Sequence, residues 1–121
     1  MRIDLHTHST ASDGTQPPED VVASAASAGL DVVALTDHDT TAGWTAALAA
    51  GERLGVRVVV GTEISCRVSG TSVHLLSYLH DPASPALAES MLDGRTSREQ
   101  RARLMTERLT PDVGITWDDV L

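Results

Sequence analysis

The sequence predicts an α/β fold built on a parallel sheet. Within the first 80 residues, short runs rich in β-branched side chains alternate with longer alanine-rich stretches, which is the pattern of strand–helix–strand units. The run at 31–36 is mostly apolar, as expected of a strand covered on both faces. Proline and glycine stand between these runs, where element boundaries are expected.

The first helix shows how the boundaries are placed. It is expected at 18–28 because a proline suits the first turn, Glu19 and Asp20 favour the positive end of the helix, and Gly29 is a natural stop. The same reasoning predicts strands at 2–6, 31–36 and 56–60, and a second helix at about 41–54 that ends at Gly55.

The alternation changes after residue 60. The runs at 64–68 and 72–79 are separated only by Ser69-Gly70-Thr71, a spacing that favours an antiparallel hairpin. Asp81-Pro82 and Pro85 then break the chain. The remaining expected elements are helices at 86–92 and 96–109 and a helix capped by Thr116.

Length, charge and cysteine content limit the possibilities. The 121 residues allow one ordinary domain. The net charge of -8 does not favour nucleic acid or an anionic membrane, so an anionic substrate would need a local device such as bound cations. A single cysteine, Cys66, excludes an internal disulfide and fits a reducing compartment. With no leader before Ile3 and no membrane-length apolar run, a cytoplasmic location is expected.

Histidines and acids gather at the expected strand ends. His6 and His8 are one residue apart, so in an extended backbone both project from one face at metal-chelating distance. Parallel βα architectures place their chemistry at the carboxyl edge of the strands, and imidazoles with carboxylates suit Zn, Mn or Fe. The other members of the set are Asp13, Asp37-His38-Asp39, Glu63 and His74.

Each of these residues also has a purely structural interpretation. An isolated His-x-His can be a surface accident, and Asp13-Gly14 can be an ordinary turn. Asp37 and Asp39 can cap the helix that follows, Glu63 can be a solvated acid, and His74 can be a core histidine. Their joint occurrence after three successive strands favours a metal site.

The motifs also carry a family resemblance over residues 1 to about 80. His6-Thr7-His8-Ser9 with Ser12-Asp13-Gly14, then Leu35-Thr36-Asp37-His38-Asp39, then Gly61-Thr62-Glu63-Ile64-Ser65, then His74, resemble the successive motifs of the PHP family, named for polymerase and histidinol phosphatase. The resemblance implies the N-terminal part of a distorted (β/α)7 barrel over 1–80, followed by the start of a helical insertion over 81–121. It also implies two or three divalent ions (Mn, Fe or Zn) and hydrolysis of a phosphoester.

The resemblance implies a role for each matched residue. His6 and His8 resemble the ligands of one metal, Glu63 resembles a carboxylate that bridges two metals, and His74 resembles a ligand of the second. In the complete site, a hydroxide activated by the metals would attack phosphorus.

A third metal is implied in the same way. Asp13 and His38 resemble its ligands. Asp37 resembles a residue that orients neighbouring ligands.

The arginine-rich stretch from Arg95 to Leu109 is similar to the helical insertion of one PHP branch, whose members act on nucleoside 3',5'-bisphosphates and related 5' nucleotide or RNA ends. Arg98 and Arg101 are therefore candidate substrate-binding residues, because the guanidinium fork suits phosphate. The alternative is a solvated helix face with pairs such as Glu99 with Arg103. The expected partner is a small phosphorylated, nucleotide-like substrate, with no membrane.

Three functions stay open. The family supplies three further ligands, a His and a later Asp-x-His pair, whereas no histidine here lies beyond His80. The first reading is a phosphoesterase that hydrolyses a phosphate monoester, and the second is a truncated, inactive metal-binding or interaction module completed by another chain or a C-terminal half. The third is a zinc amidohydrolase, which shares His-x-His but normally needs a carboxylated Lys, and the sequence has no Lys.

Overall fold

The computed structural model describes residues 1–120 and shows the expected α/β fold. Its elements, in chain order, are β1 (Ile3–Thr7), α1 (Pro18–Ser27), β2 (Val32–Leu35), α2 (Trp44–Leu54), β3 (Arg57–Val68), β4 (Thr71–Tyr78), α3 (Pro85–Val113) and the 3₁₀ helix η1 (Trp117–Asp119).

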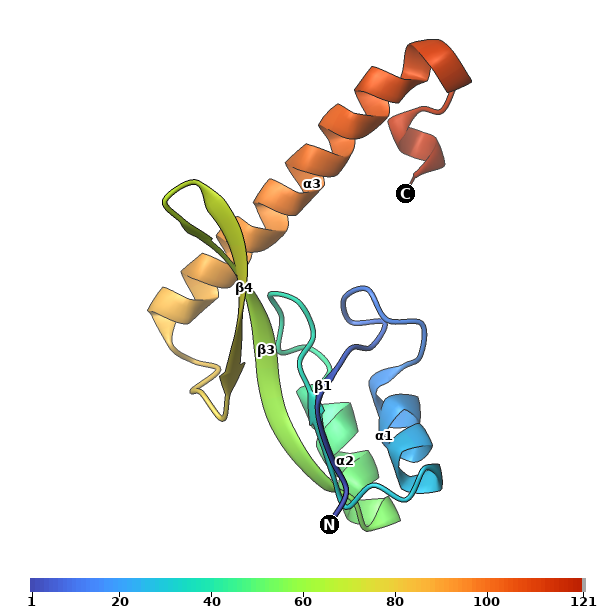
Figure 1. Ribbon diagram of the computed structural model, residues 1–121, viewed down its shortest axis with the longest axis vertical. Helices are drawn as coiled ribbons and strands as arrows, with labels where there is room; N and C mark the ends of the chain where they lie inside the picture. The colour runs from blue at the N-terminus through green and yellow to red at the C-terminus, as the bar shows by residue number, and fades with distance from the viewer. Residues whose placement is uncertain (121) are drawn as a thin grey trace.

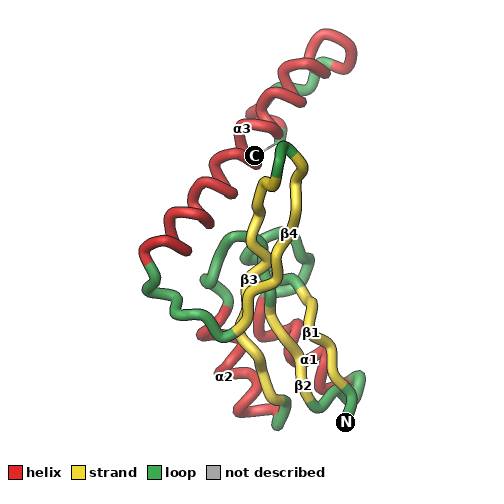
Figure 2. The backbone as a smooth tube through the Cα atoms, turned by 60° about the vertical axis from the view of Figure 1, so that its left-hand side comes forward, coloured by secondary structure: helices red, strands yellow, loops and turns green. Residues whose placement is uncertain are grey.

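The four strands form one sheet in the order β1-β2-β3-β4. The first three strands are parallel, whereas β4 pairs antiparallel with β3. Helices α1 and α2 lie side by side on the same face of the sheet (Figures 1 and 2). This arrangement leaves the carboxyl ends of β1 and β2 at one edge, beside the middle of β3.

The hydrophobic core lies between β2 and these two helices. Val22, Val33 and Leu35 are each 1% exposed, and each such side chain contributes about 1.5–3 kcal/mol of transfer free energy. Ala47 and Ala50 of α2 are fully buried, which allows the helix backbone to approach the core closely. The core therefore holds β2, and the residues that follow β2, in a fixed position.

Strand β3 differs from the expectation of two separate strands at 56–60 and 64–68. It is continuous from Arg57 to Val68, because a second partner strand takes over where pairing with the first one ends. Residues 57–60 pair with β2, and residues 61–68 pair with β4. The prediction that Glu63 follows a strand was therefore wrong, since Glu63 lies within β3.

Helix α3 also differs from the expectation of two helices at 86–92 and 96–109. It is one helix of 29 residues that runs through Gly94. A glycine costs a helix only about 1 kcal/mol relative to alanine, which contacts elsewhere can offset. The helix crosses beside β3 and then projects away from the sheet (Figure 1). Within residues 1–120, no helix combines the length and the apolar character needed to cross a bilayer.

The helix expected after Thr116 is present, but only as a short 3₁₀ helix of three residues. Thr116 is the N-cap residue of η1, and Asp119 Oδ2 accepts hydrogen bonds from the Thr116 N–H and Oγ1 at 2.8 and 2.7 Å. These hydrogen bonds lower the pKa of Asp119. The Arg103 guanidinium lies 4.7 Å from the centre of the Trp117 ring, which packs η1 against α3.

Candidate metal centre

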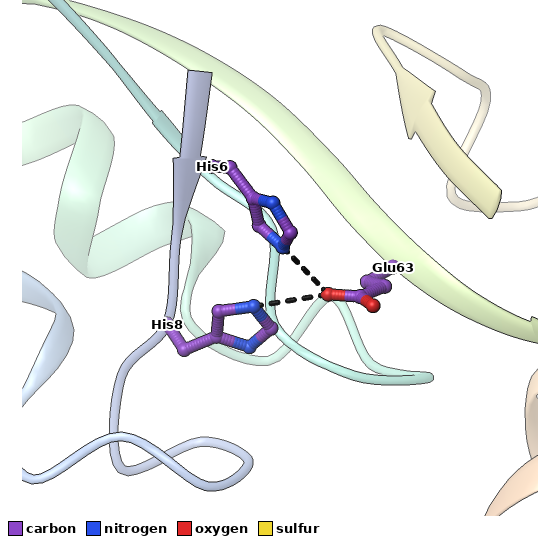
Figure 3. A group of neighbouring side chains, drawn as sticks. All are labelled: His6, His8 and Glu63. Atoms are coloured by element: carbon purple, nitrogen blue, oxygen red, sulfur yellow. Dashed lines mark hydrogen bonds and ion pairs between the residues drawn. The ribbon is translucent and has the colours of Figure 1, made fainter. Parts of the chain in front are cut away.

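His6 and His8 converge on one oxygen atom of Glu63 (Figure 3). His6 Nε2 lies 2.7 Å and His8 Nε2 3.0 Å from Glu63 Oε2. Between Asp4 and Thr7 the register of β1 against β2 shifts, which is a bulge-like irregularity of the kind that re-aims side chains beside active sites. The expected geometry, in which both imidazoles face the same way, is present.

Glu63 lies at the centre of the cluster and is 6% exposed. Its second oxygen, Oε1, lies 2.6 Å from His74 Nδ1 on β4. Burial alone would raise the pKa of Glu63, but hydrogen bonds with His6 and His74 and the nearby imidazole of His38 together hold it below its ordinary value. The carboxylate is therefore ionised near neutral pH.

His38 continues the parallel ladder beyond the end of β2, because it forms an isolated bridge with Glu63. Its Nε2 lies 3.8 Å from Glu63 Oε2 and 3.6 Å from Asp13 Oδ2. Burial is the largest influence and lowers the pKa of His38, while the charge of Glu63 opposes it only in part and Arg98 adds to the lowering. His38 is therefore neutral near pH 7, which is the form that binds metals.

The four imidazoles form a continuous row. The ring centres of successive pairs, His6–His8, His8–His38 and His38–His74, are 5.1, 4.7 and 4.9 Å apart. Three groups of three ligand atoms, each within 4.8 Å of one another, result: His6 with His8 and Glu63, His8 with Asp13 and His38, and His38 with Glu63 and His74. The structure thus brings together all six residues that the sequence suggested as ligands.

The chemistry of this cluster fits divalent cations. His8 Nδ1 lies 3.1 Å from Asp13 Oδ1, yet it is buried and has no hydrogen-bond partner within residues 1–120. A nitrogen and a carboxylate oxygen that face each other without sharing a hydrogen bond are arranged as two ligands of one ion would be. Imidazole nitrogens with carboxylate oxygens suit Zn, Mn and Fe.

Asp37 is 2% exposed and organises the loop after β1. Its Oδ1 accepts from the N–H of Ser9 and the hydroxyl of Ser12, and its Oδ2 accepts from the hydroxyl of Ser9, all at 2.7 Å. The loop that it fixes carries Asp13. Ser9 and Ser12 lie within the sequence motifs, but the sequence alone indicated no role for them.

Asp39 is fully buried and bonds to β3 and α3. Its carboxylate accepts from the N–H and hydroxyl of Ser65, at 2.8 and 2.7 Å, and from Arg98 Nη2 at 2.9 Å. The helix-capping alternative for Asp37 and Asp39 was wrong, because Gly43 is the N-cap of α2 and no side chain caps that end.

A groove of about 980 Å³ adjoins the cluster, between the β3–β4 hairpin and α3. Arg98 and Arg101 both line it, but Arg98 Nη2 is engaged by Asp39 and Ser65, whereas Arg101 has no ion-pair partner within residues 1–120. The expected pair of Glu99 with Arg103 is present at 3.9 Å. Sequence reasoning missed Arg67, which also lines the groove and follows the Glu63 motif by only a few positions.

Residues 4–115 match the PHP domain family, and the chain therefore belongs to this family. A phosphoribosyl 1,2-cyclic phosphate 1,2-diphosphodiesterase from Eggerthella lenta is 51% identical over 73% of the chain and 34% of its own length. A 3',5'-nucleoside bisphosphate phosphatase from Chromobacterium violaceum is 43% identical over 85% of the chain and 36% of its own length. The relatives are thus phosphoesterases, of which the chain spans little more than a third.

Solved structures agree with the family. A crystal structure of a "putative metal-dependent phosphoesterase" from Bifidobacterium adolescentis superimposes with a TM-score of 0.92 and 42% identity, over 99% of this chain and 42% of the other. An amidohydrolase from Chromobacterium violaceum, with bound sulfate and no metal, gives 0.86 and 40% identity, over 96% of this chain and 40% of the other. The curled sheet therefore corresponds to the N-terminal part of a PHP-type barrel, as expected.

Proposed function

We propose that this chain is the metal-binding portion of a phosphoesterase that hydrolyses a phosphate monoester of a small, nucleotide-like molecule. The observation that carries the proposal is the convergence of six His, Asp and Glu side chains, Glu63 among them, next to a groove lined by arginines. The nucleoside bisphosphate phosphatase among the relatives supports the substrate class. There are three ligand groups, and His8, His38 and Glu63 each belong to two of them, so we propose two or three ions of Mn, Fe or Zn.

The ligand groups suggest how the residues divide the work. His6 and His8 would hold one ion and His74 a second, with Glu63 between them; Asp13 and His38 would hold a third. When bound, the cations supply Lewis-acid chemistry: they offset phosphoryl charge and lower the pKa of water towards neutrality.

The protein side chains contribute before any reaction begins. Neutral His38 and ionised Glu63 are already in the protonation states that metal binding requires. Asp37 holds the loop of Asp13 in place. Arg101, on the groove wall, would bind a phosphate oxygen, as a guanidinium does in a bidentate pair.

The proposal extends to the organisation of the chain. Residues 1–80 would form the N-terminal half of the metal-binding barrel and residues 81–121 the start of a helical insertion, of which α3 is the main part. The cytoplasm, as a reducing compartment, fits the single cysteine Cys66.

The test combines metal counting with a phosphatase assay on the 121-residue chain. After chelation and reloading with Mn, Fe or Zn separately, bound metal is counted by elemental analysis, and release of inorganic phosphate from a nucleoside 3',5'-bisphosphate is followed. Glu63→Gln and His8→Ala should lose metal and turnover. Glu52→Gln, on the exposed side of α2, is the matched control for Glu63→Gln and should keep both. Unchanged turnover in Glu63→Gln would overturn the proposal.

A second candidate function is an inactive metal-binding module that another chain completes. It is favoured by the sheet edges, since β1 and β4 both lie at an edge and Ile3 and Leu75 are 51% and 56% exposed. Exposed edge strands invite pairing with another chain. Stoichiometric metal binding without phosphate release would favour this module over the phosphoesterase.

A further inference from the structure

We propose that Asp39 is a positioning residue that couples the docking of α3 to the spacing of the metal ligands His38 and Glu63. The inference rests on the proposed function, because it concerns residues assigned there as ligands. Asp39 is fully buried and has a φ of 52°, a left-handed conformation that few non-glycine residues adopt. Asp tolerates this conformation better than most residues do, and hydrogen bonds with Ser65 and Arg98 hold it there.

The backbone around Asp39 belongs to the metal centre. Its N–H donates to the carbonyl oxygen of Glu63 at 3.1 Å, and the preceding residue is His38, which bridges to Glu63. Its carboxylate accepts from the N–H and hydroxyl of Ser65, two residues beyond Glu63. Asp39 thus ties the segment that carries His38 to the strand that carries Glu63 by backbone and side chain together.

Helix α3 closes on the other side of the same carboxylate. Arg98 Nη2 donates to Asp39 Oδ2 at 2.9 Å and to the hydroxyl of Ser65 at 2.8 Å, and Arg95 donates to the carbonyl oxygen of Asp39. A Cβ atom added to Gly94 would lie 2.8 Å from Oδ1, Oδ2 and Cγ of Asp39, so the helix can approach this closely only with glycine. This contact accounts for a glycine inside α3.

Two independent features therefore point to one function for Asp39. The hydrogen bonds fix His38 relative to Glu63, and the glycine contact with the arginine bonds fixes α3 against Asp39. A displacement of α3, which carries Arg101 and forms one wall of the groove, would be transmitted through Asp39 to the ligands. The groove and the metal centre would then respond to each other.

The test uses substitutions in α3 that leave every proposed ligand in place. Gly94→Ala should dislodge α3 although alanine favours the helix more than glycine does. Arg98→Met should have the same effect, and Arg98→Lys should restore part of the contact because a single nitrogen makes both bonds. The controls are Thr96→Ala, an exposed α3 position that gains helix propensity, and Arg108→Met, an exposed α3 position that loses the same charge.

Two measurements are made on each variant. In the chelator-treated chain, amide hydrogen exchange at Asp39 and Ser65 should be about tenfold faster in Gly94→Ala and Arg98→Met than in the controls. In a Co²⁺ titration followed by visible absorption, the affinity should fall by about tenfold or more in the same two variants.

Each outcome decides a separate question. Unchanged exchange at Asp39 and Ser65 would overturn the docking of α3 on Asp39. Faster exchange with unchanged Co²⁺ affinity and spectrum would overturn the positioning role. Failure of the unsubstituted chain to bind Co²⁺ at all would contradict the proposed function instead, and the exchange comparison would still decide whether α3 docks through Asp39.

Discussion

Glu63 and His74 lie diagonally across the β3–β4 pair, with Oε1 and Nδ1 2.6 Å apart. The register pairs His74 with Ser65, so His74 falls on the face of the hairpin that carries Glu63. A slip of one residue would turn His74 to the opposite face. The hairpin register therefore brings His74 into the candidate metal centre.

His74→Ala should remove about one bound ion per chain, because the ion assigned to His74 would keep only the shared carboxylate of Glu63. Elemental analysis of the reloaded chain measures this loss. His80→Ala is the matched control, since His80 packs against Trp44 outside the ligand groups. Equal metal content in the two variants would exclude His74 as a ligand.

Asp37→Asn should lower the free energy of unfolding by about 2 kcal/mol, because three hydrogen bonds to a buried carboxylate are weakened. Urea denaturation of the metal-free chain measures the change. The loop of Asp13 should also loosen, which is detected as faster amide exchange at Ser9. Asp112→Asn, at an exposed position near the end of α3, should change neither quantity appreciably.

The metal-free chain should lose stability on acidification. His38 and Glu63 both have folded-state pKa values below their ordinary values of 6.5 and 4.5, so the unfolded chain binds protons more readily than the folded chain. The contribution of His38 is lost as the pH falls below 6.5, and that of Glu63 as the pH falls from 4.5 through its lowered pKa.

Urea denaturation at a series of pH values tests this order. His38→Gln should flatten the profile between pH 6.5 and the onset of carboxylate titration. If His38→Gln leaves the slope of the profile in this range unchanged, the lowered pKa of His38 is contradicted.

Trp44→Phe should destabilise the chain by about 2 kcal/mol, because Trp44 is 8% exposed and its Nε1–H donates to the carbonyl oxygen of Gly61 at 2.9 Å. The comparison is Trp117→Phe, which weakens only the contact with Arg103 and should cost about 0.5 kcal/mol. Thermal or urea denaturation of the two variants gives the difference directly. Equal losses would contradict the buried hydrogen bond at Gly61.

The parts of this structure that the sequence predicted are those set by local patterns. The βα alternation reflects burial on a strand or helix period, and the spacing of His6 and His8 already places both on one face. The convergence of Glu63 with these histidines follows from the parallel order of the first strands. Local patterns therefore predicted which of these side chains lie close together.

The parts that escaped prediction depend on contacts between distant segments. The polar run around Glu63 interrupts the apolar pattern, so the continuity of β3 becomes visible only when both β2 and β4 are present as partners. Gly94 suggests a helix end by its intrinsic preference, but it lies within α3 because it faces Asp39, 55 positions away along the chain. Asp39 likewise suggests a helix cap by its intrinsic preference. Nothing in the neighbouring sequence indicates that Arg98 is its partner.

The change of partner along β3 places the cluster of candidate ligands at the junction between two parts of the sheet. Up to Val60 the strand belongs to the parallel βα layer, and from Gly61 onward it belongs to the hairpin. His6 belongs to the parallel layer and His74 to the hairpin. Ions held by His6 and by His74, with Glu63 shared between the two groups, would therefore link the layer to the hairpin. Because binding to the native state adds its free energy to folding, the metal-loaded chain should melt as one cooperative unit, whereas in the metal-free chain the hairpin can open while the helical layer stays folded.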